Sequence, residues 1–490
     1  MNREELLQQI NEWHEELDWP ESRTMLRRAI ELLSPYEDEL DEDYVWNFEM
    51  GFAHLFLDQE GPALWYLEKA LELYPGDDFG LSSREVIEGL INSCKASLAL
   101  PDFQENFRQR TIRAWEAFAA REAELRRMMD EDRTEEMMAL CGDILRLAIE
   151  NASFEIGVGG QRPELVLIPE GDRVKLFELD YFRRHVPTEA LKHWDVQIGR
   201  QPSTDTALCN DDLTITDEDV RIWVERNEAE SVTLTIYSEK LCPILQKDED
   251  RVLWLASILV AKVMGEIPYM RYIACLNMVS TPREEPAMPL GSLPQKLEEM
   301  GFDLSIGAEE LLESYSGYQM EPDDDPDAIW RADVIAGSSN CVPLIEDYLH
   351  NEAYYINNLH ADGAVAGFLF YPVGSFADED ADVSTQKIFD FRNELQNYIE
   401  QKAADAVTVT GGATGVRFCY LDFIAWDLRT VLSAAKEFFE NSDLTFAGFH
   451  VFRQGPDYIT LIDRDENGDV EPLANFIDEE EKAEESLRRL

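Results

Sequence analysis

Basic residues are scarce in this 490-residue chain, which carries 43 Lys and Arg against 100 Asp and Glu. The resulting formal net charge of −57 would repel a phosphate backbone over most of the surface, so we expect no nucleic-acid partner. Solvated acidic helix faces are the simplest source of such a charge. The same excess favours basic partners or cations.

Cysteine is also sparse, and no two of the seven cysteines form a Cys-x-x-Cys pair. Their wide, irregular spacing fits neither a disulfide framework nor a zinc knuckle, so we expect reduced thiols, most of them in the core. We predict no cofactor. The seven are Cys94, Cys141, Cys209, Cys242, Cys275, Cys341 and Cys419.

Long apolar runs are missing as well. The first residues, MNREELLQQINEWHEELDW, are charged from the outset and lack an apolar stretch of signal-peptide length. The most apolar segment, 252–263, contains Lys262 and is shorter than the ~20 residues that a membrane helix requires. We expect this segment to be a buried helix, and the protein to be cytoplasmic without a membrane partner.

Sequence motifs of catalysis are absent. The chain has no His-Glu-x-x-His, no Gly-x-Ser-x-Gly and no protein-kinase motif. Gly411, Gly412 and Gly415 match neither a dinucleotide loop nor a phosphate-binding loop, so we predict a turn between two strands. Paired carboxylates occur by chance among 100 acids, and none stands out as a general acid and base.

What the chain does contain is a helical pattern over residues 1–100, with a distinctive spacing inside it. Gly51, Ala63, Ala70 and Pro75 are separated by 12, 7 and 5 residues. This spacing resembles the tetratricopeptide repeat, in which small residues let paired helices cross closely and a proline ends the second helix. The resemblance implies a short, irregular array with either a peptide-binding groove or a plain docking surface.

Short strands and helices follow the helical region, which predicts α+β domains. We expect strands at 163–169 and 175–182 in the middle of the chain. The pattern in the last part of the chain predicts helices packed over a mostly antiparallel sheet, with one helix at 428–440. The proline-rich stretch 281–294 is the candidate boundary between the two.

A chain of this length indicates about three folded domains. The predicted fold class is therefore multidomain α+β. It comprises a tetratricopeptide-like α-helical repeat at 1–130, followed by two α/β sandwich domains at 131–285 and 286–490.

Tryptophans on the predicted repeat helices are candidate partner-binding residues, because aromatic side chains dominate interface energetics. Packing inside the core at helical spacing is the alternative. The candidates are Trp13, Trp46 and Trp65, together with the neighbouring Trp19.

One acidic segment partly matches a calcium-binding loop, in which alternate side-chain oxygens surround a hard cation. The expected glutamate at position 12 is replaced by Ala474, and Pro472 interrupts the exit from the loop. A hairpin turn at Asn467–Gly468 is the favoured interpretation. The candidate metal ligands are Asp463, Asp465, Asn467, Asp469 and Glu471.

Cys341 precedes a predicted helix, a position that can lower the pKa of a thiol. His360 follows within twenty residues, and Asp362 could orient its imidazole. The sequence therefore allows a cysteine-dependent enzyme that uses Cys341 and His360. A structural loop is the favoured alternative, because no protease signature surrounds the cysteine.

Several tracts resemble uncharacterised bacterial proteins in which tetratricopeptide-type helices precede α/β domains of unknown function. These tracts are 330–349, 359–373, 411–428 and, in the middle region, 189–202. The layout is similar to that of immunity or accessory proteins of contact-dependent toxin systems, a similarity at the level of fold. We therefore predict a non-enzymatic interaction protein with a basic protein partner, and keep the Cys341 enzyme as the alternative.

Overall fold

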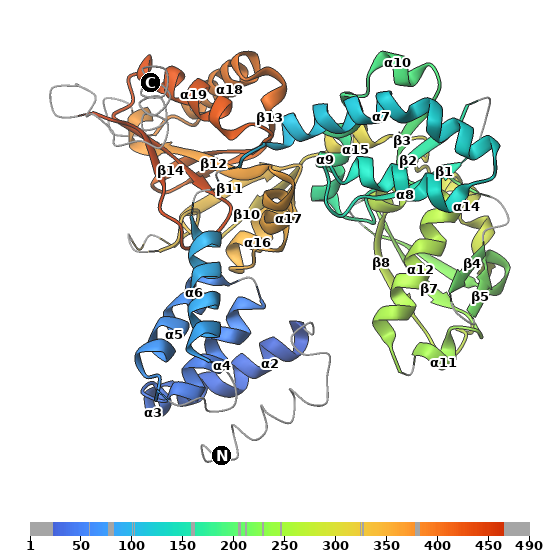
Figure 1. Ribbon diagram of the computed structural model, residues 1–490, viewed down its shortest axis with the longest axis horizontal. Coiled ribbons are helices and arrows are strands. Elements are labelled where there is room, and N and C mark those ends of the chain that lie inside the picture. The colour runs from blue at the N-terminus through green and yellow to red at the C-terminus, as the bar shows by residue number, and fades with distance from the viewer. Residues whose placement is uncertain are drawn as a thin grey trace. The chain divides into compact units, whose positions relative to one another are not determined.

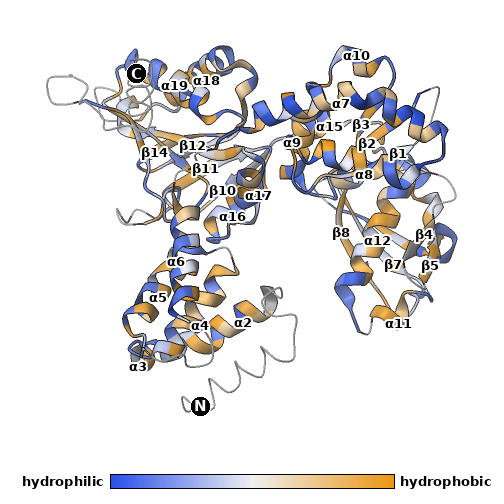
Figure 2. Cartoon of the chain, in the orientation of Figure 1, coloured by the Kyte–Doolittle hydropathy of each residue, from blue (hydrophilic) through white to orange (hydrophobic). Residues whose placement is uncertain are grey.

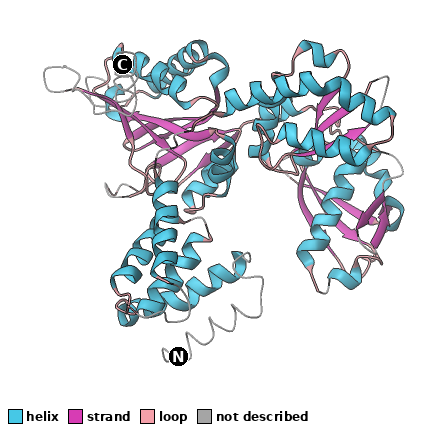
Figure 3. Cartoon of the chain, in the orientation of Figure 1, coloured by secondary structure: helices cyan, strands magenta, loops and turns pink. Residues whose placement is uncertain are grey.

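The computed structural model describes residues 23–464, apart from short gaps at 58, 77–82, 100, 102, 158–161, 204–206, 211–212, 228–229, 246, 324, 326–327 and 378–382. The fold is mixed α+β, as predicted (Figure 3). The chain divides into two compact units, one formed by Met1–Arg108 with Ser316–Leu490 and the other by Gln109–Tyr315. These limits differ from the predicted boundaries after residues 130 and 285. Independent folding of the three predicted domains, 1–130, 131–285 and 286–490, stays a prediction.

Helices form the beginning of the first unit. Asp43 caps α4, where its carboxylate accepts hydrogen bonds of 3.0 Å from the amides of Val45 and Trp46. α4 packs against both α2 and α5, and α5 packs against α6. The bounds are α2 (Arg23–Leu33), η1 (Ser34–Tyr36), α3 (Glu37–Leu40), α4 (Tyr44–Leu55), α5 (Glu60–Glu72) and α6 (Arg84–Leu98).

Small residues lie at the contact between α4 and α5. A Cβ atom on Gly51 would approach Cγ of Leu67 to 2.7 Å, so only glycine allows the two helices to cross this closely. Ala63 and Ala70 are fully buried on α5. The predicted packing role of these residues is confirmed for this helix pair. Membership of the tetratricopeptide family stays a prediction.

A seven-stranded antiparallel sheet forms the rest of the first unit (Figure 1). Its strand order is β10-β11-β13-β14-β12-β15-β16, and every neighbouring pair is antiparallel. The bounds are β10 (Ser316–Gln319), β11 (Val334–Ser339), β12 (Val365–Pro372), β13 (Val407–Gly415), β14 (Phe418–Ala425), β15 (Phe446–Val451) and β16 (Ile459–Asp463).

The four central strands have the βαββαβ connectivity of a ferredoxin-like fold. β12 leads through α18 (Thr385–Lys402) to β13, and β14 leads through α19 (Leu428–Glu440) to β15. The order β13-β14-β12-β15 places the third strand of this motif between the first and second. The predicted layer of helices over an antiparallel sheet is confirmed for this part of the chain.

The two faces of this sheet differ in chemistry. α18 and α19 cover the face that carries aliphatic side chains such as Leu369 and Leu421. α16 (Val342–Leu349) and α17 (Tyr354–Asp362) lie on the opposite side (Figure 1). That side carries Phe368, Tyr420 and Asp422 in the alternate strand positions. Further 3₁₀ turns are η4 (Val373–Phe376) and η5 (Ala404–Ala406).

Gly411 and Gly412 lie inside β13, so the turn predicted for them was wrong, whereas Gly415 is the last residue of β13 and directly precedes the short turn to β14. A Cβ atom on Gly412 would lie 2.6 Å from the carbonyl oxygen of Tyr420 on the neighbouring strand. Gly412 therefore allows a close approach of two strands rather than a change of direction.

The second unit contains two larger sheets and a hairpin. One sheet has the order β1-β2-β3, the other β8-β7-β6-β9, and β4 pairs with β5. The strands are β1 (Ser153–Gly157), β2 (Glu164–Ile168), β3 (Asp195–Ile198), β4 (Ala207–Asn210), β5 (Leu213–Thr216), β6 (Arg221–Arg226), β7 (Val232–Tyr237), β8 (Ile273–Met278) and β9 (Met288–Pro289). The helices are α7 (Phe107–Asp130), α8 (Thr134–Leu145), α9 (Arg173–Arg184), α10 (Thr188–Leu191), α11 (Cys242–Leu245), α12 (Glu249–Met264), α13 (Glu266–Tyr272), α14 (Leu293–Glu299) and α15 (Ala308–Leu312), with turns η2 (Asp217–Asp219) and η3 (Leu290–Ser292).

The predicted strand at 175–182 was wrong, because these residues belong to α9. The side chain of Asp172 accepts hydrogen bonds from the amides of Val174 at 2.7 Å and Lys175 at 3.0 Å. This cap starts a helix, and the helix buries side chains at nearly every position from 174 to 182.

The apolar segment of the second unit forms α12, a buried helix as predicted (Figure 2). Among the described residues, no single helix combines the length and apolar composition needed to cross a membrane. α12 and α13 reach that length only together, and the chain bends by 113° between them. Gly265 makes this bend with a φ of +91°, which favours glycine.

Candidate functional site

The candidate tryptophans differ in exposure. Trp46 is fully buried, and its indole N–H donates a 3.2 Å hydrogen bond to the carbonyl oxygen of Leu33. Core packing therefore accounts for Trp46, and its ring is not open to a partner. Trp65 on α5 is 52% exposed, with the Lys69 ammonium 5.1 Å from its ring. Trp13 and Trp19 lie outside the described residues.

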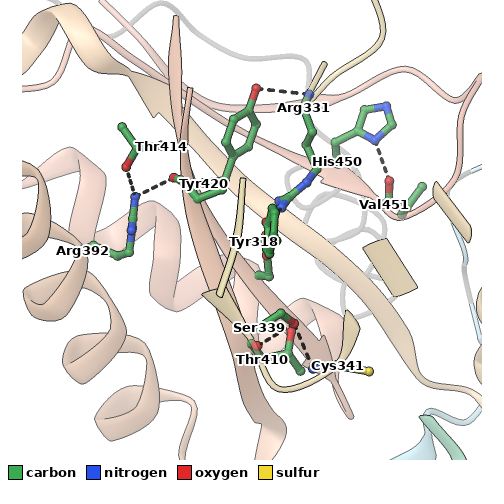
Figure 4. A network of polar contacts seen from close by, with 12 residues as sticks. Tyr318, Arg331, Ser339, Cys341, Arg392, Thr410, Thr414, Tyr420, His450 and Val451 are labelled. Carbon is green, nitrogen blue, oxygen red and sulfur yellow. Dashed lines mark hydrogen bonds and ion pairs between the residues drawn. The ribbon is translucent and has the colours of Figure 1, made fainter. Parts of the chain in front are cut away.

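Cys341 lies immediately before α16 and is only 1% exposed. Its amide donates a 2.9 Å hydrogen bond to Oγ of Ser339, and this hydroxyl donates to the carbonyl oxygen of Thr410 at 3.1 Å (Figure 4). These bonds fix the connection between β11 and α16. Because the thiol is buried, the surrounding fold would have to open before a substrate could reach it.

His360 and Asp362 both lie on α17, near its C-terminal end. Burial, together with the nearby positive charge of Arg453, lowers the pKa of His360 to about 3. Its Nε2 atom is buried and has no hydrogen-bond partner, and its ring lies edge-on to Phe103 at 5.9 Å. Such an imidazole is a poor base at neutral pH. The proposed pairing of Cys341 with His360 stays a prediction that this environment disfavours.

The pKa of His360 predicts a loss of stability on acidification. Below pH 6.5 the unfolded chain takes up a proton that the folded chain does not accept until about pH 3. The free energy of unfolding should therefore fall by about 1.4 kcal/mol per pH unit over this range. Urea titrations at pH 7 and pH 5 measure this change. Between these two pH values, the free energy of unfolding of His360→Leu should fall by about 2 kcal/mol less than that of the parent protein. Equal losses in both proteins would contradict the prediction.

A buried ion pair occupies the face of the sheet opposite α18 and α19. The Arg331 guanidinium pairs with the carboxylate of Asp422 on β14, and each side chain is 1% exposed. Arg331 also donates a 2.6 Å hydrogen bond to the Tyr318 hydroxyl (Figure 4). Burial raises the pKa of Asp422, and the adjacent guanidinium opposes this shift.

Aromatic rings enclose this guanidinium. The centroids of Phe368, Tyr420 and Phe452 lie 5.1–5.5 Å from the Arg331 guanidinium carbon. Arg331 itself has a φ of +71°, a conformation that persists only where the surroundings enforce it. The network holds the segment before β11 against the sheet, and its charged groups are not open to solvent.

The carboxylate of Asp333 extends this network. It accepts hydrogen bonds from the Arg417 amide at 2.8 Å, the Phe418 amide at 3.0 Å and the Tyr420 hydroxyl. Sequence reasoning did not identify these residues. The only signal was an acid inside the apolar strand CYLDFIA, where Asp422 faces the core.

A second buried ion pair joins the helical part of the first unit to the end of its sheet. The carboxylate of Glu60 on α5 lies 2.6 Å from the Arg453 guanidinium, with the two side chains 5% and 3% exposed. Arg453 also donates to the side chain of Asn357 on α17. The helices and the sheet are therefore linked by a charge pair that has lost most of its contact with water.

The acidic clusters do not form a metal site among the residues that the structure describes. In the described part of the chain, no group of three or more His, Cys, Asp or Glu residues is placed to hold a metal ion. Asp463 ends β16. The other four residues of the calcium-type pattern, Asp465, Asn467, Asp469 and Glu471, lie outside the described residues, so that alternative stays a prediction.

Comparison with known proteins adds no assignment. No protein-family model, no curated protein sequence and no solved structure matches this chain. Its function therefore has to be inferred from its own residues.

Proposed function

We propose that this chain is a non-enzymatic, cytoplasmic interaction protein that binds a basic protein partner. Its most specific form would be an immunity or accessory protein that neutralises a basic toxin domain. The observation that carries the proposal is the position of the acidic excess. Among the described residues, eight acidic residues are buried, and the other described acids whose burial is known are exposed or partly exposed. The eight are Glu49, Glu60, Glu178, Asp180, Glu266, Asp333, Asp362 and Asp422.

An exposed acidic surface of this size accelerates encounters with a basic partner and disfavours acidic ones. The buried ionisable groups support the same proposal, because Arg331, Asp422, Glu60 and Arg453 are engaged in ion pairs that stabilise the fold. The rival enzyme would need an accessible thiolate at Cys341 and a competent base at His360. The burial of the thiol and the low pKa of the imidazole give no support to it.

The proposal predicts a stoichiometric complex that salt dissociates. The tagged chain would be incubated with extract of its native cells at about 0.1 M and about 1 M salt, where the Debye length falls from about 10 Å to about 3 Å. Mass spectrometry should identify one basic partner that is retained only at low salt. The purified partner should then bind with a fixed stoichiometry in calorimetry.

An unrelated protein of similar isoelectric point controls for general attraction between opposite charges. The proposal is wrong if no partner appears at either salt concentration, or if the control captures the same proteins. Substrate turnover that Cys341→Ala abolishes would instead establish the rival enzyme.

A further inference from the structure

A cavity of about 500 Å³ opens on the first unit beside α18 and α19. Its walls come from η4, from the middle of α18, and from the end of α19 with the residues that follow it. We propose that this cavity binds a lysine or arginine side chain of a basic protein partner. This inference rests on the proposed function and deepens it by naming where the partner is held.

Aromatic rings form the inner wall of the cavity. Phe438 lies at the centre, with its ring centroid 5.4 Å from those of both Phe391 and Tyr398. Phe376 packs against Phe391, with ring centroids 5.2 Å apart, and also lines the cavity. Phe391, Tyr398 and Phe438 are only partly buried, so they present ring surface to the cavity. The negative face of an aromatic ring attracts a cation.

Two carboxylates at the edge of the cavity give it a negative charge. Glu394 on α18 and Asp443 after α19 are both exposed lining residues. Within the described residues, neither carboxylate forms an ion pair, whereas the nearby Glu437 is paired with Lys402 at 2.8 Å.

Two cationic groups of this region, Lys402 and Arg464, are already engaged. The Lys402 ammonium lies 5.4 Å from the Tyr398 ring, so the protein itself places a cation against one of these aromatic side chains. The Arg464 guanidinium donates to the carbonyl oxygens of Glu440, Leu444 and Ser442. Glu394 and Asp443 therefore remain as the carboxylates that a guest cation can neutralise.

The size of the cavity agrees with a side chain as guest. Binding pockets for small ligands measure roughly 300–1,000 Å³, and the long apolar stems of lysine and arginine suit an aromatic wall that ends in carboxylates. An anion would meet two like charges, and an uncharged apolar guest would leave both carboxylates without a partner.

The test uses a fluorescein-labelled oligolysine peptide and the full-length chain. Fluorescence anisotropy should show that Glu394→Gln/Asp443→Asn binds the peptide about tenfold more weakly than the parent protein, or about 1.4 kcal/mol. Tyr398→Leu, which keeps the lining carboxylates but removes a ring, should bind about threefold more weakly. An oligomer of acetyl-lysine, equal in length but uncharged, should not bind.

The matched control is Glu400→Gln/Glu440→Gln, which removes two exposed charges from the same two helices without altering the cavity lining. It should bind oligolysine within about twofold of the parent protein. The inference is overturned if this control weakens binding as much as the cavity variant, or if the cavity variant binds like the parent. Saturable binding of free N-acetyl-lysine methylamide without binding of oligolysine would also overturn it, by indicating a small-molecule site.

The two proposals can fail separately. A native partner that binds the cavity variant and the parent protein equally well would leave the proposed function intact and refute the cavity. Absence of any native partner would refute the proposed function, while the oligolysine result would still decide whether the cavity takes a basic side chain.

Discussion

Replacing Asp422 with alanine is expected to lower the free energy of unfolding of the first unit by about 3–5 kcal/mol. The reason is that Arg331 would keep its charge inside the protein without a counter-charge. Both side chains of the pair are 1% exposed, so water cannot replace the carboxylate. Urea unfolding followed by circular dichroism measures the effect. Because the chain forms two compact units, the unfolding curve is fitted with two transitions.

Two control proteins separate the buried charge from other effects of this substitution. Arg331→Met/Asp422→Leu removes both charges and should recover most of the loss, because a well-packed apolar pair often replaces a buried ion pair. Glu136→Ala breaks the exposed pair with Arg133 and should leave the free energy of unfolding close to that of the parent protein. A loss below about 1 kcal/mol in Asp422→Ala would show that the pair does not hold the sheet as described.

Replacing Arg453 with methionine is expected to lower the free energy of unfolding by a similar amount, about 3–5 kcal/mol. The substitution keeps a long apolar stem but leaves the Glu60 carboxylate buried without its partner. Because this pair joins α5 to the end of the sheet, the helices should also open more readily. Hydrogen exchange should therefore rise in α4, α5 and α6 before it rises in β12 and β14.

The chain provides a matched control for this second substitution. Arg27 on α2 pairs with Glu352 at 2.6 Å and likewise joins the helices to the sheet-containing part, but its side chain is 51% exposed. Arg27→Met should therefore cost less than about 1 kcal/mol. Equal losses in the two variants would mean that burial is not what gives the Glu60–Arg453 pair its importance.

Local sequence patterns predicted elements well where caps and periodicity agreed. The helix expected at 428–440 is α19 with the same bounds. Asp427 caps it by accepting a hydrogen bond from the Thr430 amide, and the buried positions Leu428, Val431 and Leu432 recur at helical spacing. The prediction for 175–182 failed because apolar and polar residues alternate over 177–181, and the helix cap at Asp172 outweighed that short pattern.

The functional candidates were predicted less well, because they depend on contacts between distant parts of the chain. Arg331 and Asp422 are 91 residues apart in sequence, and each alone resembles an ordinary charged residue. The cavity combines residues of η4 and two helices, and helical periodicity does not show which aromatic rings remain exposed. Sequence patterns also did not distinguish the exposed Trp65 from the buried Trp46.

The first unit combines two stretches that lie far apart in the chain, Met1–Arg108 and Ser316–Leu490, and this affects synthesis of the protein on the ribosome. Glu60 is translated early, yet its partner Arg453 follows only after the whole of Gln109–Tyr315 has been made. At about 5–20 residues per second, the wait for the roughly 390 intervening residues is about 20–80 s. During that time the early helices expose the surface that the sheet will later cover. Nascent chains should therefore associate with chaperones through this surface until the last strands emerge.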